Sequence, residues 1–202
     1  MGNSERQSRP RRLIIGVSGA SGTIYALRLL EKLNRHTNLE THLILTRGAE
    51  RTAYLETGKL AKDFKALATH SYPLEDIGAK LASGSFLTDG MIVAPCSIHT
   101  MSAIAAGISS NLLIRAADVT LKERRPLILM VREMPFHLGH LRTMTALAEM
   151  GAIIAPPVPG FYHNPQTVLD LVDHCVERVL DLAGFPAENA RRWDPEWQTK
   201  AP

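Results

Sequence analysis

The chain has 202 residues, 45% of them hydrophobic and 21% charged, which is enough for one globular domain with a full core. The net charge of +3 is small, and no run of Lys and Arg with interleaved aromatics supports nucleic-acid binding. No apolar run reaches the roughly 18 residues of a membrane span, and the polar first residues contain no apolar signal core. The two cysteines lie far apart, with no disulfide framework and no metal-binding spacing. We therefore expect a cytoplasmic protein without a membrane span.

Apolar runs alternate with segments of helical spacing along the whole chain. In chain order, the pattern predicts a strand at 12–18, a helix at 24–33, a strand at 39–46, a helix at 48–57, a strand at 90–95, helices at 97–106 and 111–123, a strand at 126–131, a helix at 140–150 and a strand at 152–156. Asn164 and Pro165 have the pattern of an N-cap and a first-turn proline, so we expect the last helix to run from there to about Leu182.

Continuous apolar strands between helices are typical of a parallel sheet that helices cover on both faces. We predict an α/β fold: a single domain with a doubly wound parallel sheet, a Rossmann-like or flavodoxin-like three-layer sandwich. This domain should span residues 12–185, with a disordered lead-in at 1–11 and a tail at 186–202 that contributes to an oligomer or to the site. Ligands of such sheets bind beyond the carboxyl ends of the strands, so the turns that follow strands are the places to search.

The first of these turns lies in GVSGASGT. Its spacing fits no dinucleotide fingerprint, because Ser18 stands where a glycine is needed, and it fits neither a P-loop nor a nucleophile elbow. Its backbone N–H groups and the hydroxyls of Ser21 and Thr23 could hold an anion. A simple tight turn from strand to helix explains the same residues equally well.

The second turn lies in APCSIHTMSA, where Pro95 is expected to end a strand. Ser97 is a plausible helix N-cap with Thr100 at the third helical position, and the same helix start could form a phosphate cup. Thr46 and Arg47 stand where a dinucleotide site would place its ribose-binding acid. Two polar helix starts and no ribose acid favour a mononucleotide over a dinucleotide.

The third turn lies in RRPLILMVREMPFH, where an apolar strand ends in Arg132 and Glu133. A surface turn often carries such a pair. Neighbouring strand positions point to opposite faces, however, so the arginine could bind a phosphate while the glutamate transfers a proton. Arg115 and Lys122, seven residues apart, share a helix face that is either simply solvated or a second phosphate site. His137 and His140 have no third metal ligand near them in the sequence, so we expect no metal.

Together these stretches resemble the UbiX/Pad-type flavin prenyltransferase family, over nearly the whole chain from Arg12 to Trp193. The resemblance is carried by GVSGASGTIYALRLLEKL, ASGSF, MIVAPCSIHTMSAIAAGISSNLLIRAADVTLKERRPLILMVREMPF and GFYHNPQTVLDLVDHCVERVLD. It implies a flavin-binding domain that joins a dimethylallyl group from dimethylallyl phosphate to N5 and then C6 of reduced FMN, without a metal. The product, prenylated FMN, would serve a partner UbiD-type decarboxylase. The family also implies a homododecamer with sites between subunits.

The resemblance also implies roles for individual residues. The cofactor contacts of the family fall on Gly19, Ala20, Ser21, Thr46, Ser97, Ile98, His99, Thr100 and Arg132. The substrate contacts fall on Arg115, Lys122, Tyr162, Arg178 and Trp193. The catalytic positions are Glu133, which handles a proton, Lys122, which stabilises the leaving phosphate, and the supporting polar residues Ser21 and Glu56. Ile98 and His99 depart from the small residues that some members carry there.

Two alternatives compete with this interpretation. One is an FMN-dependent cysteine decarboxylase of related fold, which would lack the set of Lys122, Arg132, Glu133, Tyr162 and Arg178 that this chain has. The other is a non-enzymatic FMN carrier, which would not need the acid or the phosphate-binding residues.

Overall fold

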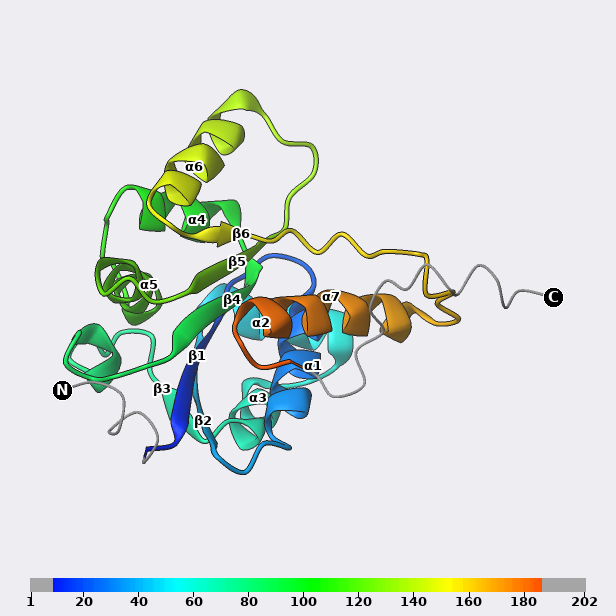
Figure 1. The fold of residues 1–202 in the computed structure, drawn as a ribbon, viewed down its shortest axis with the longest axis horizontal. Helices are drawn as coiled ribbons and strands as arrows, with labels where there is room; N and C mark the ends of the chain where they lie inside the picture. The colour runs from blue at the N-terminus through cyan, green and yellow to red at the C-terminus, as the bar shows by residue number, and fades with distance from the viewer. Residues whose placement is uncertain (1–8, 187–202) are drawn as a thin grey trace.

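The computed structural model describes residues 9–186, which form one sheet of six strands with helices around it (Figure 1). The strands are β1 Arg11–Val17, β2 Leu39–Leu45, β3 His70–Tyr72, β4 Gly90–Cys96, β5 Leu127–Val131 and β6 Ile153–Ile154. The α-helices are α1 Thr23–Leu33, α2 Arg47–Thr57, α3 Ala61–Leu67, α4 Ile98–Ala105, α5 Leu112–Lys122, α6 Leu138–Glu149 and α7 Val168–Leu182, and Lys80–Ala82 form a 3-10 turn, η2. The strand order is β3-β2-β1-β4-β5-β6 and every pairing is parallel, which confirms the predicted doubly wound fold.

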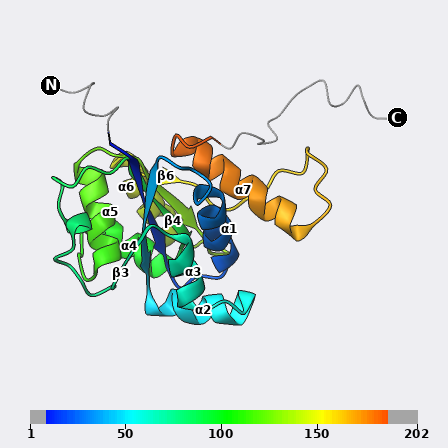
Figure 2. The ribbon, with the colours of Figure 1, turned by 90° about the horizontal axis from the view of Figure 1, so that it is seen from below.

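Helices cover both faces of the sheet, as Figures 1 and 2 show from two directions. One buried cluster joins the sheet to α1, α2, α3 and α7, and a second joins the other face to α4, α5 and α6. All seven residues of β4 and all five of β5 are buried. Burial on both faces is the reason why these strands appear in the sequence as uninterrupted apolar runs.

The centre of the sheet contains the point where the chain reverses its winding. β1 and β4 are neighbours, but the helices that follow them, α1 and α4, pack on opposite faces. Such a reversal opens a crevice beyond the carboxyl ends of the two strands, and this is where parallel α/β sheets bind their ligands. The turns after β1, β2, β4 and β5 all reach this edge of the sheet.

The start of the last helix differs from the prediction. Asn164 is not an N-cap: it has a positive φ of 52°, and α7 begins only at Val168. Thr167 is the N-cap, and it forms a capping box with Asp170, in which each side chain binds the backbone N–H of the other. This reciprocal pair satisfies two N–H groups, so it determines the helix start in place of the Asn-Pro pattern.

Several boundaries also differ. The sequence did not predict α3 or β3, and β4 continues through Pro95 to Cys96, so the proline does not end the strand. β1 begins at Arg11, inside the expected lead-in. β6 has only two residues, and the other expected elements are found within a few residues of their predicted bounds. Trp193 and most of the expected tail lie outside the described residues. Among residues 9–186, no helix is both long and apolar enough to cross a membrane.

Candidate active site

A buried serine connects the two strands on either side of the crevice. Ser18, directly after β1, is 1% exposed. Its hydroxyl donates to the carbonyl oxygen of Pro95 at 2.8 Å and accepts the N–H of Ser97 at 2.7 Å. Its own N–H also donates to the Pro95 oxygen, at 3.2 Å. Ser18 therefore fixes the turn after β1 against the turn after β4. In the sequence, Ser18 stands out only because a dinucleotide motif would need a glycine at this position.

The first two turns also pack closely on each other. A side chain at Gly19 would place its Cβ 3.0 Å from the Cα of Gly48, a backbone atom that cannot move aside easily, so the position requires glycine. Thr46 caps α2, accepting the N–H of Ala49 at 3.1 Å, and its own N–H donates to the Val17 oxygen at 3.0 Å. The predicted cofactor positions Gly19 to Ser21 and Thr46 are thus neighbours at one edge of the sheet.

The helix start after β4 has the predicted cap. The hydroxyl of Ser97 accepts the N–H of Thr100 at 3.2 Å and donates to the Thr100 hydroxyl at 3.1 Å, which confirms Ser97 as the N-cap. Thr100 is only 4% exposed, so both of its polar groups are used inside the cap. Ile98 and His99 are the first two residues of α4, so their amides have no acceptor within the helix. These two amides form the open part of the cup.

The helix start after β1 is already occupied by a side chain of the protein. The carboxylate of Glu56, from α2, accepts the N–H of Gly22 at 2.9 Å, the N–H of Thr23 at 3.0 Å and the hydroxyl of Thr23 at 2.9 Å. Burial raises the pKa of Glu56, but the hydrogen bonds from Ser21, Thr23 and Gly22 outweigh it, so the pKa lies below its ordinary value. At Gly22 and Thr23, the anion that this turn holds is therefore the carboxylate of Glu56.

This carboxylate predicts a pH-dependent contribution to stability. The pKa of a glutamate in an unfolded chain is about 4.3, and that of folded Glu56 is lower, so its ionised form stabilises the fold above about pH 4.3. The contribution is lost as the pH falls through the folded pKa. Because Glu56 is exposed, Glu56→Gln should lower the free energy of unfolding at pH 7 by only about 1 kcal/mol. Urea unfolding at pH 7 and pH 3 would measure this, and a difference that does not shrink in acid would contradict it.

Arg132 and Glu133 follow β5 at the same edge. The N–H of Arg132 donates to the Cys96 oxygen at 3.0 Å, which places the pair beside the α4 cup. The positive charge of Arg132 acts on Tyr25 of α1: burial and Cys175 raise the pKa of Tyr25, and Arg132 opposes them. Glu133 is half-buried, and its carboxylate accepts the N–H of Met134 at 2.9 Å. The sequence prediction that these two charges reach the ligand edge agrees with their position.

Lys122 lies at the opposite ends of the strands, beside their amino termini. It is the last residue of α5, five residues before β5 begins at Leu127, whereas Glu133 follows the end of that strand. β5 has five residues, so it separates the two positions by about 13 Å of strand. Arg115 lies on the outward side of the same helix, paired with Asp118. One chain therefore cannot bring Lys122 to its own Arg132 and Glu133.

Tyr162 and Arg178 lie on the face of the sheet that α5 does not cover. The Tyr162 hydroxyl is 3.0 Å from Nε2 of His174 on α7, and Nδ1 of His174 accepts the N–H of Gly160 at 3.3 Å. His174 and Arg178 are four residues apart, so they share a helix face, and Arg178 is exposed. His174, which the sequence did not single out, positions the loop that carries Tyr162. The sequence could have pointed to His174, because a spacing of four residues places it on the same helix face as Arg178.

Comparison with known proteins identifies the family of this chain. A family model described as Flavoprotein matches residues 1–180. Flavin prenyltransferase UbiX of Escherichia coli strain K12 is 51% identical over 185 residues, which make up 91% of this chain and 98% of that protein. This chain belongs to the UbiX flavin prenyltransferase family. UbiX of Thauera aromatica is also 51% identical, over 90% of this chain and 93% of its own length.

Solved UbiX structures have the same fold. The crystal structure of a dodecameric FMN-dependent UbiX-like decarboxylase from Escherichia coli O157:H7 has a TM-score of 0.89 at 48% identity, over 91% of this chain and 99% of that chain. AnUbiX in complex with FMN and dimethylallyl pyrophosphate has a TM-score of 0.90 at 42% identity, over 92% of this chain and 98% of its own. The cypemycin decarboxylase CypD and the cysteine decarboxylase TvaF are only 18% and 20% identical, so they share the fold alone.

Proposed function

We propose that this chain is a flavin prenyltransferase that joins a dimethylallyl group from dimethylallyl phosphate to N5 and C6 of reduced FMN. The observation that carries the proposal is the 51% identity, over nearly the full length of both chains, to a protein named flavin prenyltransferase UbiX. The product, prenylated FMN, would be released to a UbiD-type decarboxylase, and the enzyme would work in the cytoplasm. Among the positions taken from the resemblance, the described residues include all but Trp193.

The edge around the crevice suits a mononucleotide phosphate. The amides of Ile98 and His99 point out of a helix start, and the guanidinium of Arg132 lies beside that cup, so an anion would meet N–H donors and a positive charge together. Gly19 and Ser21, in the turn held by Ser18 and Glu56, would contact the flavin. Bound reduced FMN would supply the nucleophilic N5 and C6 positions, and the protein would hold them against the allyl carbons.

The charged residues fit the bond changes that the reaction requires. When the allylic C–O bond breaks, its electron pair leaves with the phosphate, so negative charge builds there and positive charge builds on the allyl fragment. Lys122, Arg178 and Arg115 would stabilise the phosphate, and Tyr162 would hold one of its oxygens. Glu133 would accept the proton that N5 loses and pass it to the departing phosphate.

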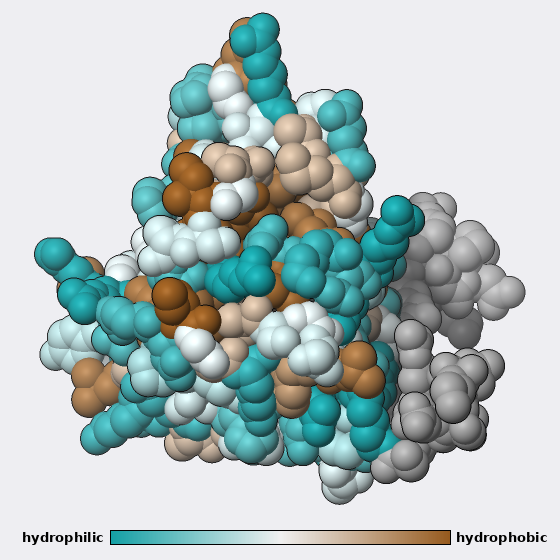
Figure 3. Space-filling model, turned by 90° about the vertical axis from the view of Figure 1, so that its left-hand side faces the viewer, coloured by the Kyte–Doolittle hydropathy of each residue, from teal (hydrophilic) through white to brown (hydrophobic). Residues whose placement is uncertain are grey.

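A second copy of the chain is needed to complete this set. Lys122 lies at one edge of the sheet and Glu133 at the other, so Lys122 of a neighbouring copy would have to reach the crevice. Large apolar side chains are exposed on both segments that flank the crevice, as expected of surfaces that pack against another copy. They are Met134, Phe136, Leu138 and Leu141 on one segment, and Val158, Phe161, Tyr162, Val168 and Leu169 on the other. Figure 3 shows the left-hand side of the molecule in Figure 1, where groups of apolar residues lie among polar ones. We propose a dodecamer, the assembly named for the related protein from Escherichia coli O157:H7.

An anaerobic mass assay tests the proposed function. The purified protein, incubated with reduced FMN and dimethylallyl phosphate, should yield a flavin heavier by one C5 unit. Parallel reactions with dimethylallyl diphosphate show which substrate it prefers. FMN that binds without a gain in mass with either substrate would indicate a carrier. Release of CO2 from a peptide with a C-terminal cysteine would instead support the cysteine decarboxylase.

A further inference from the structure

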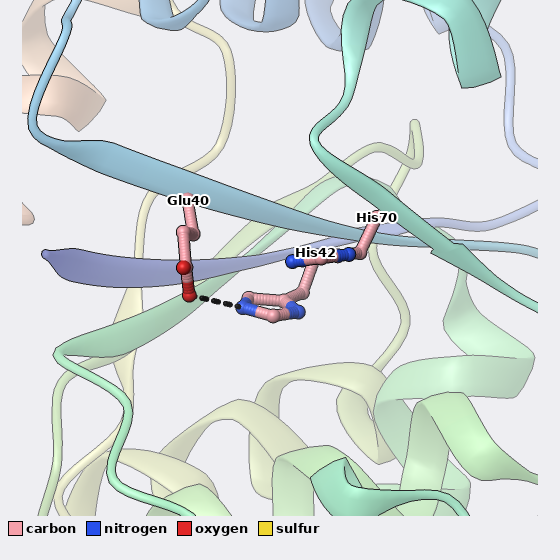
Figure 4. A group of neighbouring side chains, drawn as sticks. All are labelled: Glu40, His42 and His70. Atoms are coloured by element: carbon pink, nitrogen blue, oxygen red, sulfur yellow. Dashed lines mark ion pairs between the residues drawn. The ribbon is translucent and has the colours of Figure 1, made fainter.

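A cluster of two histidines and a glutamate lies away from the crevice. Glu40 and His42 are two residues apart in β2, so their side chains project from the same face of the sheet. His70 of the neighbouring strand β3 is paired with His42 in register, and the two rings stack with centroids 4.9 Å apart. Figure 4 shows the three side chains together beneath the two strands. Each residue offers one ligand atom, a nitrogen or an oxygen, and these three atoms all lie within 4.8 Å of one another.

His42 carries the observation that points to a ligand. Its side chain is fully buried, and its Nε2 has no hydrogen-bond partner. The same atom lies 3.8 Å from Oε2 of Glu40, too far for a hydrogen bond and close enough for both atoms to bind one ion.

Neighbouring residues hold the side chains of His42 and Glu40 in place. The Tyr72 hydroxyl lies 2.9 Å from Nδ1 of His42 and can accept its N–H, which leaves the lone pair of Nε2 directed at the cluster. Nε of Arg12 donates to Oε2 of Glu40 at 2.7 Å, and this oxygen keeps a second lone pair for an ion. Zinc holds nitrogen and oxygen ligands at about 2.0–2.2 Å, so closure of this group around an ion needs movements of about 1 Å or less per side chain.

We propose that Glu40, His42 and His70 form a binding site for a divalent transition metal of the zinc type. A His2Glu set leaves the fourth position to water. β3 has only three residues and pairs with β2 alone, so an ion shared by the two strands would fix the edge of the sheet. Glu40 and His42 lie in the first half of β2, whereas Thr46 follows its end. The metal would thus have a structural role, apart from prenyl transfer.

Two nearby cations oppose metal binding. Arg12 and Lys80 both stack over Phe86, which contacts the His42 ring edge-on, so their positive charges lie close to the cluster. Among the described residues, the acid that lies against His42 is Glu40, whose Oε2 is 3.8 Å from Nε2 of His42. Removal of the exposed Lys80 charge in Lys80→Gln should therefore tighten metal binding, and this direction distinguishes the site from histidines elsewhere on the surface.

Calorimetric titration of zinc into chelator-treated, untagged full-length protein tests the proposal. One zinc ion should bind per chain, and it should raise the melting temperature. Loss of one ligand in His70→Ala or Glu40→Gln should weaken binding by at least about a hundredfold, more than loss of an outer contact usually costs. Both variants should keep prenyl transfer, which shows that they fold. His36→Ala, at an exposed histidine, should bind zinc like the unmodified protein.

Three results would overturn the proposal. The first is no zinc binding at micromolar protein concentrations. The second is binding that survives both His70→Ala and Glu40→Gln. The third is binding that is lost in His140→Ala, because the neighbouring rings of His137 and His140 would then be the site.

Discussion

Glu133→Gln should slow prenyl transfer by about 10²–10⁴-fold, the range that a positioned general acid or base contributes. Glutamine keeps the size of the side chain and can still accept the N–H of Met134, which Glu133 binds at 2.9 Å. It cannot take up the proton that N5 must lose. FMN affinity should stay unchanged, because the contacts assigned to the cofactor phosphate come from the α4 helix start and Arg132. Single-turnover kinetics and a fluorescence titration with FMN would measure the two effects.

Glu149→Gln is the matched control, because Glu149 is an exposed acid at the end of α6. It should leave both the rate and the affinity for FMN unchanged. Near-normal turnover in Glu133→Gln would remove Glu133 from the mechanism. Loss of FMN binding in that variant would make its role structural.

Lys122→Ala should lower kcat/KM for dimethylallyl phosphate by about 10²–10³-fold, since it removes a charged donor from the phosphate that leaves in the transition state. In a single chain Lys122 is an exposed side chain paired with Glu123, so its loss should leave the fold intact. Lys122→Arg should recover part of the rate. Lys62→Ala, which removes an exposed lysine from α3, is the control. A fully active Lys122→Ala enzyme would contradict the phosphate assignment.

The fold was largely predictable because its main strands are buried on both faces. β4 and β5 have no exposed position, so each is an uninterrupted apolar run bounded by turn residues. β3 escaped detection for the opposite reason: His70, Ser71 and Tyr72 are an edge strand of three polar or aromatic residues, without a buried run. The start of α7 was misplaced because the reciprocal bonds of Thr167 and Asp170 outweigh the Asn-Pro pattern.

The candidate site was predictable where it depends on strand ends. Ser97 and Arg132 each follow a recognisable strand, and parallel strands bring such residues to one edge. The sequence did not indicate that Glu56 would fill the start of α1, since its partners Gly22 and Thr23 are remote in the chain. The cluster at His42 was missed for a related reason: its ligands come from two strands, and their proximity depends on the register between them.

A mixed-oligomer assay tests most directly whether the site is shared between copies. Glu133→Gln and Lys122→Ala chains, each nearly inactive alone, are produced together in equal amounts and purified as mixed oligomers through two different tags. If Lys122 serves the Glu133 of a neighbouring copy, about one quarter of the sites in a random mixture should contain both intact side chains. Prenyl transfer should then return to about one quarter of the rate of the unmodified enzyme. Mixed oligomers that stay as inactive as the separate variants would show that both residues must come from the same chain, and would contradict the shared site.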